Sequence, residues 1–99
     1  MRIVFFTTGG TIDKAYLKRK GTYNFDILEP SVKYILRNVE PNFKYDIVSL
    51  LKKDSLDINN KDRQLIFSAC KKIKADKVII THGTDTILNT AEKLSKIKN

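Results

Sequence analysis

Apolar runs of strand length alternate with helix-like stripes along most of this 99-residue chain. The runs at 2–7, 45–51 and 76–82 are rich in β-branched and aromatic residues, and each predicts a buried strand. Residues 8–28 show no sustained pattern, so we interpret them as a long polar loop. The expected order is strand, long loop, helix, strand, helix, strand, helix.

Three helices are expected where apolar residues recur every three or four positions. Pro30 and Ser31 are good helix-start residues, and Asn59 or Asn60 can cap the second helix. The third helix is expected over 84–98. The expected inward-facing residues are Val32, Ile35, Leu36 and Val39 in the first helix, Leu65, Ile66, Ala69, Cys70 and Ile73 in the second, and Ile87, Leu88, Ala91, Leu94 and Ile97 in the third.

This alternation of strands and helices favours an α/β fold with a parallel sheet between helical layers. The expected architecture is a partial doubly wound parallel sheet in three α/β/α layers. Three strands are few for that architecture, and the pattern ends on an amphipathic helix. We therefore interpret the chain as the first half of a larger domain.

Composition narrows the class of protein further. The chain is 41% hydrophobic and 30% charged, which is typical of a globular domain. No apolar run is long enough to span a membrane, and charged and turn residues interrupt the N-terminus where a signal peptide would be apolar. The single cysteine, Cys70, excludes an internal disulfide, and a reducing cytoplasm is the expected compartment.

The formal charge of +8 comes from 19 Lys and Arg against 11 Asp and Glu. These basic residues are spread along the whole chain rather than gathered in one tract with interleaved aromatic residues. We interpret them as solvated surface, and we expect no specific nucleic-acid partner.

A hydroxyl-bearing loop follows each predicted strand, with the sequences "TTGGTID", "KDSLDI" and "THGTDT". In a parallel sheet these loops lie at the same carboxyl edge, where α/β folds bind ligands. That edge should bring Thr11, Ser55, Thr84 and Asp85 toward one crevice. Gly10 allows a ligand to approach the backbone closely. The pattern predicts a small-molecule site with hydroxyl groups and a carboxylate.

These motifs resemble those of the bacterial-type L-asparaginase/glutaminase family. "TGGTI" and "THGTDT" match its two characteristic motifs, "DSLDI" resembles a third between them, and "TDTILNTAEKL" continues the match. The resemblance implies hydrolysis of L-asparagine, or of glutamine, to the acid and ammonia through a threonine acyl-enzyme. It implies no cofactor and no metal ion.

The resemblance also assigns catalytic roles to individual positions. Thr11 matches the nucleophile that attacks the side-chain amide, and Gly10 lies beside it. Tyr23 matches the loop tyrosine that assists the nucleophile, with Tyr16 as the alternative. Asp13 departs from the small residue that more often follows "TGGTI".

Substrate binding falls to the other two motifs by the same resemblance. Ser55 matches a residue that holds the α-carboxylate of the substrate. Thr84 and Asp85 match the second threonine and the aspartate of a Thr-Asp-Lys set, and Asp85 also holds the α-ammonium group. His82 has no catalytic role in the family pattern, so we interpret it as structural. Cys70 is expected to pack in the core.

The matched segment corresponds to the front part of a family member. The resemblance therefore implies that residues 1–99 form an incomplete N-terminal domain, without the set's lysine and without the C-terminal domain. Three interpretations stay open: an amidohydrolase that completes its site by self-association or with a partner chain, an inactive split or degraded product, and a non-catalytic amino-acid-binding module. We expect the chain alone to be inactive.

Overall fold

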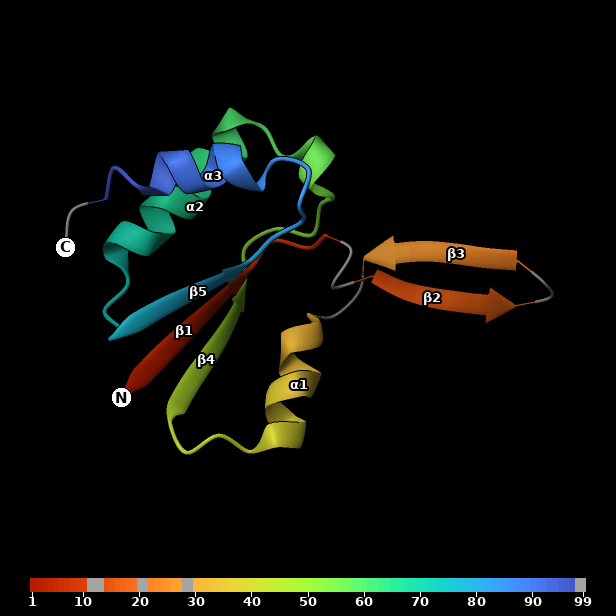
Figure 1. Ribbon diagram of the computed structural model, residues 1–99, viewed down its shortest axis with the longest axis horizontal. Coiled ribbons are helices and arrows are strands. Elements are labelled where there is room, and N and C mark those ends of the chain that lie inside the picture. The colour runs from red at the N-terminus through yellow and green to blue at the C-terminus, as the bar shows by residue number, and fades with distance from the viewer. Residues whose placement is uncertain (11–13, 20–21, 28–29, 98–99) are drawn as a thin grey trace.

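The computed structural model describes residues 1–10, 14–19, 22–27 and 30–97, with only the backbone of 14–19 and 22–27 (Figure 1). The strands are β1 (Arg2–Thr7), β2 (Lys14–Arg19), β3 (Thr22–Ile27), β4 (Lys44–Ser49) and β5 (Lys77–Thr81). The helices are α1 (Ser31–Val39), α2 (Asn60–Lys72) and α3 (Ile87–Leu94), and a 3₁₀ turn spans Ser55–Asp57.

A parallel three-stranded sheet in the order β4-β1-β5 forms the centre of the fold. The strand β1 is the middle strand, and its Phe5 is in register with Ile47 on one side and Ile79 on the other. The helix α1 lies beside β4, whereas α2 and α3 lie together beyond β5 (Figure 1). This arrangement confirms the predicted α/β fold with a parallel sheet.

The core forms on both faces of β1. Ile3 and Phe5 are buried against Val32 and Leu36 of α1. Val4 and Phe6 alternate with Ile3 and Phe5, so they point to the opposite face, and they too are buried. Burial on both faces explains why the sequence of β1 is a continuous apolar run rather than an alternating one.

The expectation of a loop over residues 8–28 is wrong, because an antiparallel hairpin of β2 and β3 occupies much of that segment. The hairpin extends away from α2 and α3 (Figure 1). Its signal is present in the sequence: in "TYNFDI", Tyr23, Phe25 and Ile27 alternate with polar residues, which is the strand period. In the sequence, Gly21 also falls between the two strand segments, and a glycine there is a common hairpin signal.

The starts of the first two helices agree with the prediction. The helix α1 begins at Ser31, directly after Pro30. Asn59 caps α2: its side chain accepts a hydrogen bond from the amide of Asp62, whose carboxylate accepts one from the amide of Asn59. This reciprocal pair is the capping box that stabilises a helix start.

Part of the predicted inward-facing set is wrong. Val32, Leu36 and Ile66 are buried, whereas the exposed members are Ile35, Val39, Leu65, Ile87, Leu88 and Ala91, with Leu88 at 81%. In α3 the buried residue is Thr90, because its hydroxyl is directed to His82, 2.8 Å from Nε2. The rotation of α3 about its axis that points Thr90 toward the fold points Leu88 toward solvent.

Three threonines at the carboxyl end of the sheet differ in their hydrogen bonding. Thr8 is fully buried, and its Oγ1 donates to the carbonyl oxygen of Thr81 over 2.8 Å. The buried Oγ1 atoms of Thr7 and Thr81 have no hydrogen-bond partner in the described part of the chain. Thr7 and Thr8 are equally buried, yet we expect the hydroxyl of Thr8 to stabilise the fold and the hydroxyl of Thr7 to destabilise it.

Replacing these hydroxyls separately tests that difference. We expect Thr7→Val to leave the free energy of unfolding unchanged or to raise it, because an unpartnered buried hydroxyl is removed. We expect Thr8→Val to lower it by about 1–3 kcal/mol, because the carbonyl oxygen of Thr81 loses a donor. Urea unfolding of the two variants beside the wild type measures both changes. A larger loss for Thr7→Val than for Thr8→Val would contradict this assignment.

Candidate active site

The loops that follow β1, β4 and β5 converge at the carboxyl edge of the sheet through close backbone contacts. Gly9 and Gly10 have φ angles of +92° and +89°, which side chains strongly disfavour. A Cβ atom on Gly9 would lie 2.5 Å from the amide nitrogen of Lys53. A Cβ atom on Gly10 would lie 2.8 Å from the amide nitrogen of Gly83. The glycines thus bring the first loop against both of the others.

Ser55 and Asp85 meet across the second and third loops, as the sequence predicted for this edge. The Oγ atom of Ser55 accepts a hydrogen bond from the amide of Asp85 over 2.9 Å and donates one to its Oδ2 atom at 3.2 Å. Ser55 is only 2% exposed, whereas Asp85 and its neighbour Thr84 are exposed. The pair therefore presents a carboxylate to solvent above a buried hydroxyl.

Gly83 makes this meeting possible. A Cβ atom on Gly83 would lie 2.9 Å from both Cβ and Oγ of Ser55. Its amide also faces Gly10. One glycine thus lies between the loop that carries Gly10 and the loop that carries Ser55.

The start of α3 lies later than the sequence suggested. The helix begins at Ile87 and its N-cap is Thr86, so Thr84 and Asp85 precede the cap. Thr86 makes no side-chain capping bond. Its Oγ1 instead donates to the carbonyl oxygen of Ser55 over 2.6 Å. Thr86 is a residue that sequence reasoning missed, because its partner is 31 positions away.

His82 connects the same loop to α3. Its Nδ1 atom lies 2.6 Å from the carbonyl oxygen of Gly83, and its Nε2 atom lies 2.8 Å from Oγ1 of Thr90. A carbonyl oxygen can only accept, so Nδ1 carries a hydrogen. Both ring nitrogens are therefore engaged within the fold, which agrees with our interpretation of His82 as a structural residue.

Lys53 anchors the second loop to the start of α2. Its amide donates to the carbonyl oxygen of Thr8 over 3.0 Å, and its Nζ atom lies 2.9 Å from Oδ2 of Asp62. Burial opposes ionisation of Asp62, but hydrogen bonds from Lys53 and from the amide of Asn59, with the charges of Lys53 and Arg63, outweigh it. The pKa of Asp62 is therefore lowered.

Other predicted site residues lie outside the described structure. Thr11, the candidate nucleophile, falls in 11–13, as does Asp13. Tyr23 and Tyr16 lie on β3 and β2, where the structure describes the backbone but not the side chains. Their roles stay predictions.

The described residues contain neither a metal-binding cluster nor a membrane-spanning helix. In those residues, no three His, Cys, Asp or Glu side chains gather where they could hold a metal ion. None of the described helices has the length and apolar character needed to cross a bilayer. Cys70 was expected in the core but is only half-buried, and this partial burial raises the pKa of its thiol.

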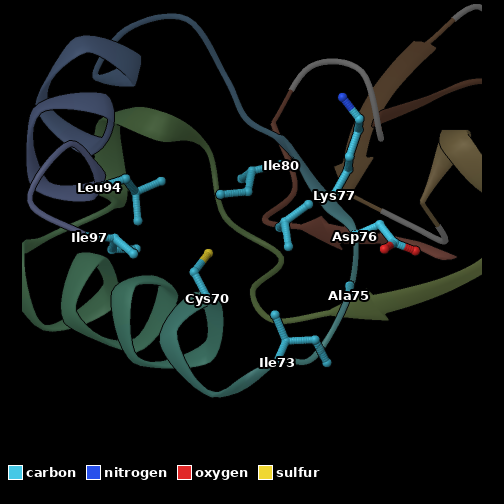
Figure 2. A pocket seen from close by; sticks show the side chains of 9 residues that line it. Cys70, Ile73, Ala75, Asp76, Lys77, Ile80, Leu94 and Ile97 are labelled. Atoms are coloured by element: carbon cyan, nitrogen blue, oxygen red, sulfur yellow. The ribbon is translucent and has the colours of Figure 1, made fainter. Parts of the chain in front are cut away.

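An apolar hollow of about 520 Å³ lies between α2, α3 and β5, apart from the site residues (Figure 2). Its lining residues are Cys70, Ile73, Ala75, Asp76, Lys77, Val78, Ile80, Leu94 and Ile97. Figure 2 shows Ile80, Leu94 and Ile97 directed into the hollow with the sulfur of Cys70. Most of these residues are apolar, with Asp76 and Lys77 as the charged members.

Known proteins resemble this chain in sequence and in fold. A sequence model of the family described as "Asparaginase, N-terminal" matches residues 2–98. Comparison with curated proteins gave no match. Among solved structures, the thermostable L-asparaginase from Thermococcus kodakarensis is similar, with a TM-score of 0.77 and 30% identity over 96% of this chain. L-asparaginase I from Vibrio cholerae has a TM-score of 0.73 and 28% identity over 95% of this chain.

A probable cytoplasmic L-asparaginase from Campylobacter jejuni has a TM-score of 0.69 and 22% identity over 91% of this chain, which shows a shared fold. The present chain spans 29% of the length of the Thermococcus and Vibrio chains and 26% of the Campylobacter chain. The similarity is therefore to one part of each of those proteins.

A double-mutant cycle can test the close contact between Gly83 and Ser55, by adding a methyl group at position 83 and then removing the side chain at position 55. We expect Gly83→Ala to destabilise the chain by about 1–3 kcal/mol, because the new methyl group displaces Ser55. We expect Gly83→Ala with Ser55→Gly to recover much of that loss, because the opposing side chain is gone. Melting curves of both single variants and the double variant complete the cycle. Strictly additive losses would show that Gly83 and Ser55 do not compete for space.

Proposed function

This chain belongs to the asparaginase family, whose N-terminal domain it matches over residues 2–98, and from that premise we propose that it serves an amidohydrolase. The proposed reaction converts L-asparagine to L-aspartate and ammonia; glutamine is the alternative substrate. The observation that carries the proposal is the Ser55–Asp85 pair at the carboxyl edge of the sheet. The names of the similar structures support the choice of substrate.

Asp85 and Ser55 would hold the amino-acid end of the substrate. The exposed carboxylate of Asp85 suits an α-ammonium group. The Ser55 hydroxyl has a single hydrogen, which it directs to Asp85 over 3.2 Å. We propose that a bound ammonium group takes over the contact with Asp85. The hydroxyl hydrogen of Ser55 would then turn to the α-carboxylate of the substrate.

Thr11 would carry the covalent chemistry. Its hydroxyl oxygen would attack the side-chain amide carbon while Tyr23, or Tyr16, receives the proton, because a threonine hydroxyl needs a base to become nucleophilic. The amide nitrogen would take that proton from the tyrosine and leave as ammonia, and water would then hydrolyse the ester to aspartate and free Thr11. Thr84 would assist the water step beside Asp85, and the absence of a Cβ atom on Gly10 would let the substrate carbonyl approach the backbone.

The chain of 99 residues supplies part of such a site. We propose that it represents an incomplete N-terminal domain that works in the cytoplasm with groups from a second copy or from a partner chain. The similarity to the Thermococcus L-asparaginase covers 29% of that chain. A non-catalytic amino-acid-binding module is the second candidate, because the binding pair of Ser55 and Asp85 is present within the chain.

We propose a second copy as the partner that covers β5. This strand pairs only with β1 among the described strands. Its Ile79 is 45% exposed, on the face of the strand opposite Ile80, which lines the hollow of Figure 2. An unpaired edge with apolar side chains favours association between chains.

Sedimentation velocity over a range of concentrations tests the association. We expect the wild type to form dimers or larger species, and Ile79→Lys to shift the distribution toward monomer, because a charged group is costly in an apolar contact. Tyr34→Lys is the matched control, since Tyr34 is exposed on α1. A stable wild-type monomer with a cooperative melt at every concentration would contradict the proposed self-association.

Activity and binding should separate in this chain. We expect negligible ammonia release from asparagine. Residues 1–99 carry the threonine and the aspartate of the Thr-Asp-Lys set but not its lysine, and loss of one member of a cooperative catalytic set removes most of the rate that the others provide. We expect weak binding of L-aspartate that Asp85→Ala or Ser55→Ala abolishes and Thr11→Ala retains. An ammonia-release assay and a calorimetric titration on the same variants measure these effects.

Each outcome decides between the two candidates. Turnover that Thr11→Ala abolishes would show that the chain is an active enzyme alone and would contradict the expected inactivity. Binding without turnover, even after mixing with other chains, favours the amino-acid-binding module. Binding that survives Asp85→Ala would overturn the proposed pocket.

A further inference from the structure

We propose that Thr86 is a positioning residue that holds Ser55 and Asp85 in a single recognition unit for the amino-acid end of the ligand. This inference rests on the proposed function for its ligand, but its structural part can be measured without one. Thr86 is not itself placed to act on the substrate. It acts through the backbone of Ser55.

The first support is the hydrogen bond that Thr86 makes in place of the usual one. A threonine at the N-cap normally accepts a hydrogen bond from an amide in the first turn of its own helix, which stabilises the start of that helix. Thr86 occupies the N-cap of α3 without such a bond. Its hydroxyl donates to the carbonyl oxygen of Ser55 over a short 2.6 Å. The residue thus gives up a local helix contact for one to another loop.

The second support is the place of this bond in a network. The amide and the carboxylate of Asp85 both bond to Oγ of Ser55, while Thr86, the next residue, bonds to the carbonyl oxygen of Ser55. The same oxygen accepts from the amide of Ile58 over 3.2 Å, which closes the 3₁₀ turn. Consecutive residues of one loop therefore hold the side chain and the backbone of the same serine.

This geometry predicts what loss of the hydroxyl would do. Without the Thr86 bond, the turn of Ser55–Asp57 would keep its internal bond to Ile58 but lose a link to the loop before α3. Ser55 and Asp85 would then meet less often in the geometry that recognises an ammonium and a carboxylate group together. The effect should fall on the distinction between ligands that have and lack the ammonium group.

The test compares Thr86→Val with Thr86→Ser. Valine keeps the shape of threonine without the donor, and serine keeps the donor. Ser95→Ala is the matched control, because Oγ of Ser95 also donates to a carbonyl oxygen, that of Glu92, over 2.6 Å on the exposed far end of α3. Each variant is titrated with L-aspartate and with succinate, which lacks the ammonium group, and thermal melts establish that it folds.

We expect Thr86→Val to reduce the preference for L-aspartate over succinate by about three- to tenfold, the range for loss of one hydrogen bond. Thr86→Ser should restore the preference, and Ser95→Ala should not change it. A role in stability alone would weaken both ligands by the same factor. Equal preference in Thr86→Val and the wild type would overturn the proposal.

A second measurement keeps this inference separate from the proposed function. The amide of Asp85 donates to Oγ of Ser55, so its hydrogen exchange reports the unit directly. We expect exchange at Asp85 to accelerate by about three- to tenfold in Thr86→Val and to stay near the wild-type rate in Thr86→Ser. If neither ligand binds the wild type, the proposed function fails, and unchanged Asp85 exchange in Thr86→Val alone overturns the positioning role.

Discussion

The site depends on the closeness with which its three loops pack at the carboxyl edge of the sheet. Gly9, Gly10 and Gly83 lie where a single added carbon would come within 3 Å of the neighbouring loop. Their small size lets the backbone of one loop lie directly against the next, so that Ser55 and Asp85 come within hydrogen-bond distance. Larger residues would separate the loops before any polar contact could form. The sheet sets which loops are neighbours, and the glycines set how near they come.

The sequence anticipated much of the fold where its pattern was regular. The strand β1 has the predicted bounds, Arg2–Thr7, because a strand buried on both faces is a continuous apolar run between polar and glycine residues. The hairpin of β2 and β3 was missed, although the alternation of Tyr23, Phe25 and Ile27 was visible. The exposure of Leu88 could not be predicted, because helical periodicity identifies an apolar stripe without fixing how much of it a neighbour covers.

In the candidate site, too, the sequence predicted one contact and missed another. The meeting of Ser55 with Asp85 follows from the rule that parallel strands place their following loops at one edge, so the motifs sufficed to predict it. The bond from Thr86 to Ser55 depends on where α3 begins, and Thr84, Asp85 and Thr86 are all suitable residues for a helix start. Local propensity could not choose among them. The choice follows from the tertiary contact with Ser55, which a single sequence does not reveal.

The central position of β1 also bears on how the chain is made. Among the described strands β1 comes first in the sequence, yet it pairs with β4 and with β5, whose residues Lys44–Ser49 and Lys77–Thr81 are synthesised much later. Non-local pairing of this kind slows folding, because the entropy of closing long loops is lost before the contacts form. During translation the apolar segment Ile3–Phe6 must therefore wait without its partners. The apolar side chains of β1 are therefore exposed until both later strands have been made.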